Sequence, residues 1–294
     1  MAGLAEGASG LRRVNVPDRR LAVLGSPIAH SKSPALHRAA YATLGLAWQY
    51  DAIETDSDDL ASFVDSRDMQ WRGLSLTMPL KRAVLPLLDS VDRVAAQAGA
   101  ANTLLFDDAS ARRVLRGFNT DVYGIATAFR AAGNDSLRTV YLLGSGATAT
   151  SALLAVASLG AERVVIFTRT PIGAAPLETL GTDLGVSVEA RGRDTHTPAF
   201  APDAVISTIP GGTHHGYSFD QETMNRSVLF DVAYDPWPST LATEWLAAGG
   251  SVISGLEMLL HQALAQVRIF VGGDPDSPLA NESAVLGAMR DSIS

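Results

Sequence analysis

One stretch in the middle of the chain constrains its fold more than any other. An apolar run, Thr139–Leu143, leads into Gly144, Gly146 and Ala149, after which a second apolar run begins. This spacing matches the G-x-G-x-x-G/A fingerprint, in which a strand, a tight turn and a helix hold the pyrophosphate of a dinucleotide. The start of that helix offers unpaired backbone N–H groups and the positive end of the helix dipole to a phosphate. Glycine pairs also occur in ordinary strand-to-helix turns, so the fingerprint alone leaves both interpretations open.

The residues that follow favour a nucleotide-binding unit. A turn at 160–162 precedes a buried type of strand at 163–167, as a β-α-β unit requires. Further strands are predicted at 204–208, 227–231 and 251–253, which would complete a second α/β sheet. A long helix at 255–271 and a terminal helix at 283–290 close the chain.

The N-terminal half also alternates strands and helices. Strands are predicted at 21–25, 48–53, 71–77, 99–106 and 112–116, and helices at 33–44, 57–69, 81–90, around 94, and at 122–132. Such alternation predicts a mainly parallel sheet, whose ligands bind outside the carboxyl ends of the strands. Thr77 and Lys81 fall at such an end. A solvated surface charge is the ordinary alternative for Lys81.

Length and composition set the class of protein. With 294 residues, 47% of them hydrophobic, and no apolar run long enough to cross a bilayer, we expect a soluble globular protein with two domains. Residues 1–18 lack the apolar segment of a signal peptide, so we predict a disordered tail and no export. The chain has no cysteine, which excludes disulfides and thiolate metal sites and suits a reducing cytoplasm. A net charge of -8 without a basic cluster argues against nucleic acid and anionic membrane as partners.

Several polar residues allow both a structural and a functional interpretation. Ser31 and Ser33 stand at a helix start, where they either cap the helix or donate to a ligand carboxylate. Asn102 is either a turn residue or a contact for a hydroxylated ligand. Asp121 stands where a helix N-cap belongs. The pair at 214–215, two histidines without surrounding carboxylates, favours a mobile loop over a metal site, so no metal is expected.

Four separated stretches match one family in sequence. They are 25–34 (GSPIAHSKSP), 76–81 (LTMPLK), 101–103 (ANT) and 119–121 (NTD), and the match continues through the glycine loop, 234–238 and 255–262. Together these motifs resemble the shikimate dehydrogenase family over nearly the whole chain after the tail. The resemblance implies reversible, NADPH-dependent reduction of 3-dehydroshikimate to shikimate, a step toward the aromatic amino acids.

The resemblance also implies how the chain divides. Residues 19–120 and 256–294 would form an α/β substrate-binding, catalytic domain, to which the C-terminal helices return. Residues 121–255 would form a Rossmann-like NADP-binding domain, with the active site in the cleft between the two. The implied partner is a small molecule, shikimate or 3-dehydroshikimate, and a homodimer stays open.

Roles follow from the resemblance position by position. Lys81 and Asp121 would be the catalytic pair, and Ser31 and Ser33 would bind the substrate carboxylate. The substrate hydroxyls would be bound by Thr77, Asn102, Asp121 and Gln262, whereas Tyr234 would approach substrate and nicotinamide. The cofactor would be bound by Gly144, Ser145, Gly146, Ala147, Thr148, Ala149, Thr168, Arg169, Thr170 and Gly255.

The chain departs from the family pattern in two places. Ser75 replaces the usual Asn two residues before the strand-end Thr77, and because serine is shorter we expect a weakened contact there. The glycine loop has Ala147 and Thr148 where Gly-Ala is usual.

The residue types agree with the implied chemistry. Hydride transfer to a ketone builds negative charge on oxygen, which a lysine ammonium stabilises and protonates while a carboxylate positions that ammonium. The cofactor brings the hydride, and no metal is required. Two alternatives stay open, namely an NAD-dependent quinate/shikimate dehydrogenase and a non-catalytic dinucleotide-sensing module built on this fold.

The end of the second fingerprint strand predicts which cofactor is preferred. An NAD site usually has an Asp or Glu about 20 residues past the glycines, which holds the ribose hydroxyls. Here that place holds Arg169 between Thr168 and Thr170, and a guanidinium fork suits a 2′-phosphate. We therefore predict NADP, with moderate selectivity because no second basic residue stands just beyond. An exposed strand-end arginine without a ligand is the alternative.

Overall fold

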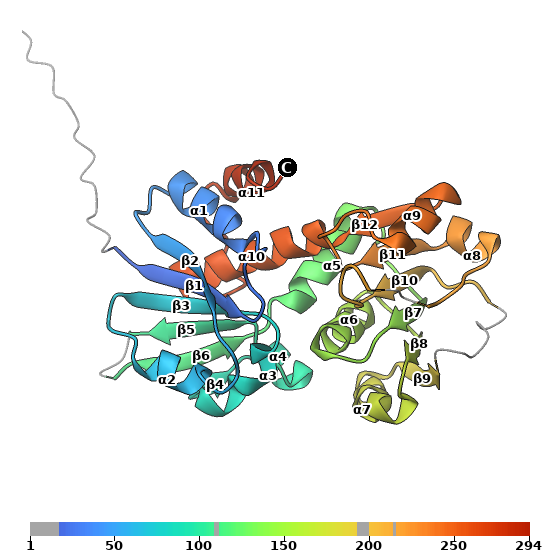
Figure 1. The fold of residues 1–294 in the computed structure, drawn as a ribbon, viewed down its shortest axis with the longest axis horizontal. Coiled ribbons are helices and arrows are strands. Elements are labelled where there is room, and N and C mark those ends of the chain that lie inside the picture. Colours follow the sequence, from blue (N-terminus) through green and yellow to red (C-terminus); the bar gives the residue numbers. More distant parts are fainter. Residues whose placement is uncertain (1–17, 109–111, 193–199, 214–215) are drawn as a thin grey trace, which may run out of the picture.

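The computed structural model describes residues 18–108, 112–192, 200–213 and 216–294. The predicted tail, apart from Asp18, and the predicted loop at 214–215 lie outside these ranges. Within them the chain forms two six-stranded sheets, each covered by helices, with the long helix α10 (Gly255–Gly272) running between the two (Figure 1). No helix in the described ranges has the length and apolar character needed to span a membrane.

The N-terminal sheet is mixed. Its strand order is β2-β1-β3-β5-β6-β4, with β1 Arg20–Gly25, β2 Gln49–Glu54, β3 Trp71–Leu76, β4 Ser90–Val91, β5 Thr103–Asp107 and β6 Val114–Phe118. β1 pairs in parallel with β2 and β3, whereas β5 is antiparallel to β3 and β6. β4 also pairs in parallel with β6, so among the described strands of this sheet only β5 runs against its neighbours. The prediction of a mainly parallel sheet is therefore confirmed apart from β5, whose hairpin connection to β6 needs no crossover helix.

Alternating side chains of β1 enter two separate cores. Leu21 and Val23 pack with helices α1 (Ser33–Thr43), α10 and α11 (Glu282–Asp291) on one face. Ala22 and Leu24 pack with α2 (Leu60–Asp65), α3 (Leu80–Ala83) and α4 (Arg93–Ala98) on the other. Successive residues of a strand point to opposite faces, so a strand covered on both sides is apolar throughout. The C-terminal helices thus complete the N-terminal sheet.

The second sheet is parallel throughout. Its order is β12-β11-β10-β7-β8-β9, with β7 Thr139–Leu143, β8 Arg163–Thr168, β9 Ser187–Gly192, β10 Ala204–Ser207, β11 Val228–Asp231 and β12 Ser251–Ser254. Numbered from β7, this is the 3-2-1-4-5-6 order of the Rossmann fold. α5 (Asp121–Ala131), α6 (Ala147–Ser158) and α7 (Ala175–Leu184) cover one face. α9 (Thr240–Ala247) covers the other, and α8 (Gln221–Arg226) precedes β11. The order reverses between β7 and β10, where such folds bind ligands.

α10 joins the two sheets into one architecture. Met258, in its first turn, belongs to the core of the second sheet, whereas Leu260 and Phe270 belong to that of the first. Gly124 of α5 allows the two helices to approach closely, because a Cβ there would lie 2.8 Å from the Met258 carbonyl oxygen. The two-domain α/β fold is therefore confirmed, whereas the exact domain boundaries stay a prediction.

Two predicted helices are shorter in the structure. The segment expected as a helix over 57–69 is helical only in α2, and beyond it the Asp68 carboxylate accepts from the Gln70 N–H at 3.0 Å in a local turn of the kind that competes with helix. The segment expected over 81–90 holds α3 and a 3-10 turn, η1 (Leu85–Leu87). Pro86 lacks the N–H that would continue the helix, and its ring excludes the carbonyl four residues earlier.

Candidate active site

A lysine and a carboxylate meet where the two sheets face each other. Lys81 lies in α3, just past the carboxyl end of β3, and Asp121 is the first residue of α5. Lys81 Nζ lies 2.6 Å from Asp121 Oδ2, and the two side chains are 16% and 4% exposed. The surface-charge alternative for Lys81 is therefore wrong. Thr120 occupies the N-cap position, and the Asp121 carboxylate is directed at Lys81 and Asn102, so Asp121 is not the cap of α5 either.

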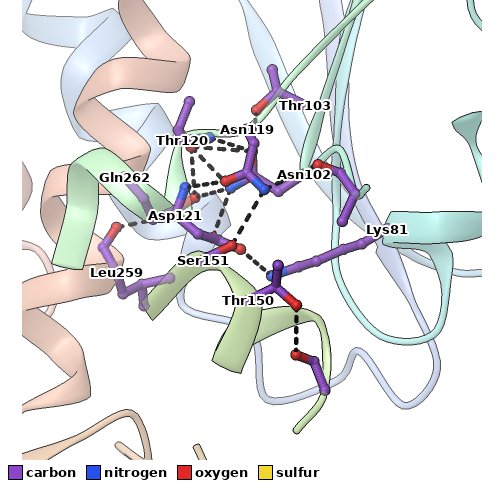
Figure 2. Close-up of polar contacts among 12 residues, drawn as sticks. Lys81, Asn102, Thr103, Asn119, Thr120, Asp121, Thr150, Ser151, Leu259 and Gln262 are labelled. Carbon is purple, nitrogen blue, oxygen red and sulfur yellow. Dashed lines mark hydrogen bonds and ion pairs between the residues drawn. The ribbon is translucent and has the colours of Figure 1, made fainter. Parts of the chain in front are cut away.

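Asn102 connects this pair to the rest of the site (Figure 2). Its Nδ2 donates to Asp121 Oδ1 at 2.8 Å, to Thr120 Oγ1 at 2.9 Å and to Gln262 Oε1 at 3.2 Å. Its Oδ1 accepts from the Thr120 N–H at 2.9 Å and from Thr103 Oγ1 at 2.8 Å. With both ends of the amide bonded, the orientation of Asn102 is fixed. Asn102 is thus the centre of a buried network rather than a simple turn residue.

The same segment is tied to α3 through the backbone. The Ala101 N–H donates to the Lys81 carbonyl at 2.8 Å, and the Asn102 N–H donates to the Phe118 carbonyl at 3.0 Å. Because the Ala101 N–H turns toward α3 instead of a neighbouring strand, β5 begins at Thr103 rather than at residue 99 as predicted. This turn places Asn102 beside Lys81 and Asp121.

Ser31 and Ser33 lie in the loop between β1 and α1. Lys32 occupies the N-cap position of α1 without a side-chain bond, so neither serine is the N-cap. Ser31 Oγ accepts from the Ser33 N–H at 3.3 Å, which serves one N–H of the first helical turn. The Ser33 hydroxyl makes no such bond, and its side chain faces the cavity described next.

One cavity of about 320 Å³ contains all the predicted catalytic and substrate-binding residues. It is lined by Ser31, Ser33, Thr77, Lys81, Asn102, Asp121, Tyr234 and Gln262, and also by Thr148 and Gly255 from the predicted cofactor set. Burial raises the pKa of the Tyr234 hydroxyl, and the nearby Asp235 carboxylate raises it further. The structure thus brings together residues that the sequence holds far apart, although their individual roles stay predictions.

The predicted cofactor residues lie at the start of α6 and the end of β8. Gly144 has φ +111°, and a Cβ there would lie 2.4 Å from Thr208 Oγ1, so the turn requires glycine. Gly146 is the N-cap of α6, where no side chain caps the first N–H groups and a Cβ would meet open space. Ala149 is fully buried against the sheet. Open space beside uncapped N–H groups fits a dinucleotide pyrophosphate.

The end of β8 is connected to this loop. Ser145 Oγ lies 3.1 Å from Thr168 Oγ1, and Thr168 Oγ1 accepts from the Thr170 N–H at 3.4 Å. Arg169 between them is exposed and has no ion pair with any described residue. A guanidinium without an internal partner fits a 2′-phosphate, and it also fits the alternative of a solvated arginine.

One lining residue, Gln266, was not predicted from the sequence. It lines the cavity together with Ser75, whose Oγ lies 2.9 Å from Gln266 Oε1. Gln266 stands four residues after Gln262, on the same face of α10, which is a signal that the sequence contains. The partners that bury Gln266 come from distant strands and helices, and no local pattern indicates them.

Comparison with known proteins identifies the family. The profile described as the shikimate dehydrogenase substrate binding domain matches residues 23–104. The shikimate dehydrogenase (NADP(+)) of Methanothermobacter thermautotrophicus is 33% identical over 262 residues, which cover 86% of this chain and 91% of that protein. The chain belongs to the shikimate dehydrogenase family.

Solved structures of family members agree with this assignment. The crystal structure of Mycobacterium tuberculosis shikimate dehydrogenase is 36% identical, covers 93% of this chain and 99% of that chain, and superposes with a TM-score of 0.78. That of the Thermus thermophilus enzyme, in complex with NADP(H) and shikimate, is 30% identical with the same coverage and a TM-score of 0.75. The family predicted from the motifs is therefore confirmed.

Proposed function

We propose that this protein is an NADP-dependent shikimate dehydrogenase, which reduces 3-dehydroshikimate reversibly to shikimate. The observation that carries the proposal is the Lys81–Asp121 ion pair, buried in a cavity that also holds the predicted substrate residues. The same cavity reaches Thr148 and Gly255, so the cofactor and substrate residues share one space. Relatives named as NADP(+) enzymes, and the Thermus thermophilus complex with both ligands, support the assignment.

The chemistry requires a hydride and a proton at one carbonyl group. When bound, the nicotinamide cofactor supplies the hydride to the ketone carbon and accepts it in the reverse direction. The ketone oxygen then gains negative charge, which the Lys81 ammonium stabilises and protonates. Asp121 holds Lys81 in place, and its carboxylate oxygens keep further lone pairs that accept from a substrate hydroxyl. Because Lys81 is partly exposed, it can recover its proton from solvent.

The remaining groups orient the substrate in this proposal. Ser31 and Ser33 donate to the substrate carboxylate at one end of the cavity. Thr77, Asn102 and Gln262 bind the substrate hydroxyls through hydroxyl and amide groups, and Tyr234 adds a phenol that burial keeps protonated. Neutral donors suit a hydroxylated acid, because they satisfy its polar groups without adding a competing charge.

Cofactor selectivity is assigned to the end of β8. We place the 2′-phosphate of NADP beside Arg169, with Thr168 and Thr170 as neutral neighbours, and the pyrophosphate at the start of α6. The domain division of 19–120 with 256–294 against 121–255 is part of the proposal. So is a cytoplasmic location, which the cysteine-free composition suits. Light scattering of the purified protein measures whether it forms a homodimer.

Steady-state oxidation of shikimate and of quinate, each with NADP and with NAD, tests the proposal. We expect the highest kcat/KM for shikimate with NADP. A preference for quinate or for NAD would instead favour the NAD-dependent quinate/shikimate dehydrogenase. No turnover of either substrate, together with measurable dinucleotide binding, would favour the non-catalytic sensing module.

A further inference from the structure

A buried polar chain lies directly beneath the substrate cavity and takes no direct part in the proposed chemistry. It begins at His37 in α1, which is fully buried and stacked on the Tyr50 ring with centroids 4.0 Å apart. His37 Nε2 lies 3.1 Å from Gln266 Oε1, and His37 Nδ1 lies 3.1 Å from the Tyr41 hydroxyl. Burial lowers the pKa of His37 to about 3, so the imidazole is neutral at neutral pH.

The backbone decides which way the Gln266 amide points. Gln266 Nε2 lies 3.1 Å from the Asn102 carbonyl oxygen, which only accepts hydrogen bonds, and 3.0 Å from Thr103 Oγ1. The amide nitrogen must therefore lie on this side, and Oε1 must lie on the side of His37. Since Oε1 only accepts, His37 carries its proton on Nε2, and its Nδ1 accepts from Tyr41. In each hydrogen bond of this polar chain, it is therefore settled which group donates and which accepts.

The same logic fixes what Ser75 offers to the cavity. Ser75 Oγ donates its one proton to Gln266 Oε1 at 2.9 Å, and it accepts from the Tyr50 hydroxyl at 2.6 Å. Burial raises the pKa of Tyr50, so its phenol keeps the proton that it donates. A hydroxyl has one donor and two lone pairs, which leaves Ser75 one free lone pair. Toward the substrate, Ser75 is therefore an acceptor only.

On the other side, the chain reaches the catalytic pair. Thr103 Oγ1 accepts from Gln266 and therefore donates to Asn102 Oδ1, at 2.8 Å. This bond holds the Asn102 Nδ2 group toward Asp121 Oδ1, 2.8 Å away. A fully satisfied buried network of this kind specifies one arrangement of its members.

We propose that Gln266, held by His37, is a positioning residue that sets the hydrogen-bonding groups of Ser75 and Asn102 toward the substrate. The inference rests on the proposed function, because shikimate is the ligand whose hydroxyls these groups would meet. It predicts that Gln266 governs substrate binding without governing cofactor binding. It also predicts that the Nε2 donor side of the amide, rather than its bulk, is what matters.

Two variants separate these effects. Gln266→Met keeps most of the volume but loses every hydrogen bond of the amide. Gln266→Glu keeps the shape, and when protonated it still donates to the Asn102 carbonyl, whereas its carboxylate form does not. The titratable groups around this position are His37 and Tyr41 from α1 and Tyr50 from β2, and their shifted pKa values keep all three neutral between about pH 6 and pH 9. Lys81 and Asp121, which lie beyond Asn102, are present in the variants and in the wild type. Dividing the KM of each variant by the wild-type KM at the same pH therefore removes their contribution to the pH dependence.

The experiment measures shikimate oxidation with NADP for wild type and both variants from about pH 6 to pH 9. We expect Gln266→Met to raise the KM for shikimate about tenfold or more, with the KM for NADP within about twofold. For Gln266→Glu, the KM for shikimate relative to wild type should rise as the pH rises. Ser227→Ala, which removes a buried hydrogen bond of 2.6 Å to the Pro202 carbonyl in the second domain, is the matched control and should leave both constants unchanged.

Three outcomes are decisive. An unchanged KM for shikimate in Gln266→Met would overturn the inference while leaving the proposed function intact. If Gln266→Met does not fold, the second variant decides. The inference is then overturned when the KM for shikimate of Gln266→Glu, divided by that of wild type, does not change with pH. A wild type that does not oxidise shikimate would refute the proposed function first, and with it this inference.

Discussion

Lys81 Nζ and Asp121 Oδ2 lie 2.6 Å apart although 40 positions separate the two residues in the chain. Lys81 follows a strand of the N-terminal sheet, and Asp121 begins the helix that leads into the second sheet. The pair therefore stands at the junction of the two domains. Its carboxylate is held by Asn102 as well, so the geometry is fixed before any ligand binds.

Removal of the Lys81 ammonium should abolish most of the activity. We expect Lys81→Ala to lower kcat by about 10²-fold or more, the usual contribution of a general acid, with cofactor affinity nearly unchanged. Arg82→Ala, at the exposed neighbour in α3, is the matched control and should stay close to wild type. Stopped-flow turnover and NADPH titration measure the two quantities. Activity within a few-fold of wild type would contradict the assignment of Lys81.

Loss of the Asp121 charge should affect catalysis more than folding. Asp121→Asn keeps the size of the side chain but leaves Lys81 without its carboxylate partner, so we expect kcat to fall by about tenfold or more. Because Asp121 does not cap α5, the melting temperature should change little, and thermal unfolding checks this. A variant that is fully active, or one that unfolds at room temperature, would show that the pair is structural.

The two loop serines should control substrate affinity. Ser31→Ala and Ser33→Ala each remove a hydrogen bond to the substrate carboxylate, worth roughly 1.5 to 3 kcal/mol when one partner is charged. We expect each to raise the KM for shikimate, with little change in the KM for NADP. Ser62→Ala, at an exposed helical serine, provides the comparison. Unchanged constants in both loop variants would mean that these serines serve only the start of α1.

Arg169 should distinguish NADP from NAD. Arg169→Ala should weaken NADP binding by roughly 1.5 to 3 kcal/mol, the scale of a hydrogen bond to a charged group, while NAD binding hardly changes. Arg226→Ala, at an exposed arginine of α8 paired with Glu222, is the control for a lost surface charge. Isothermal titration with both dinucleotides measures the effect. An equal loss for both would show that Arg169 does not contact the 2′-phosphate.

The buried His37 should make the protein less stable in acid. Its pKa is about 3 in the folded chain and 6.5 when unfolded, so the unfolded state binds the extra proton between these values. The contribution to stability is complete above pH 6.5 and is lost as the pH falls toward 3. Between about pH 7.5 and pH 5.5, we expect wild type to lose about 1.4 kcal/mol more unfolding free energy than His37→Gln. Urea unfolding at the two pH values checks this, and equal losses would refute it.

Local patterns in the sequence predicted a large part of the fold and of the site. Gly144, Gly146 and Ala149 predicted the turn at the start of α6, because each position has a steric requirement that the sequence displays directly. The residues of the cavity, from Ser31 to Gln262, were predicted through short motifs of a family, and the structure brings them to one place. Their roles remain to be measured.

Such local patterns did not predict the partners of buried polar groups. His37 and Gln266 are 229 positions apart, and their contact depends on how α1 and α10 pack on the first sheet. The residues beyond α2 and before β5 are also held by local hydrogen bonds, from the Gln70 N–H to Asp68 and from the Ala101 N–H to the Lys81 carbonyl. Ser75 is bonded to Tyr50 and Gln266, partners that no local pattern indicates, and the weakened contact expected there stays a prediction. Long-range pairing of this kind follows from the tertiary structure alone.

The central claim is that this cavity reduces 3-dehydroshikimate with NADPH. The most direct test is the rate of NADPH oxidation by the purified protein when 3-dehydroshikimate is added, with shikimate identified as the product. We predict saturable turnover that is slower with NADH at equal concentration. No oxidation of either cofactor, with NADPH bound and the protein folded, would contradict the account.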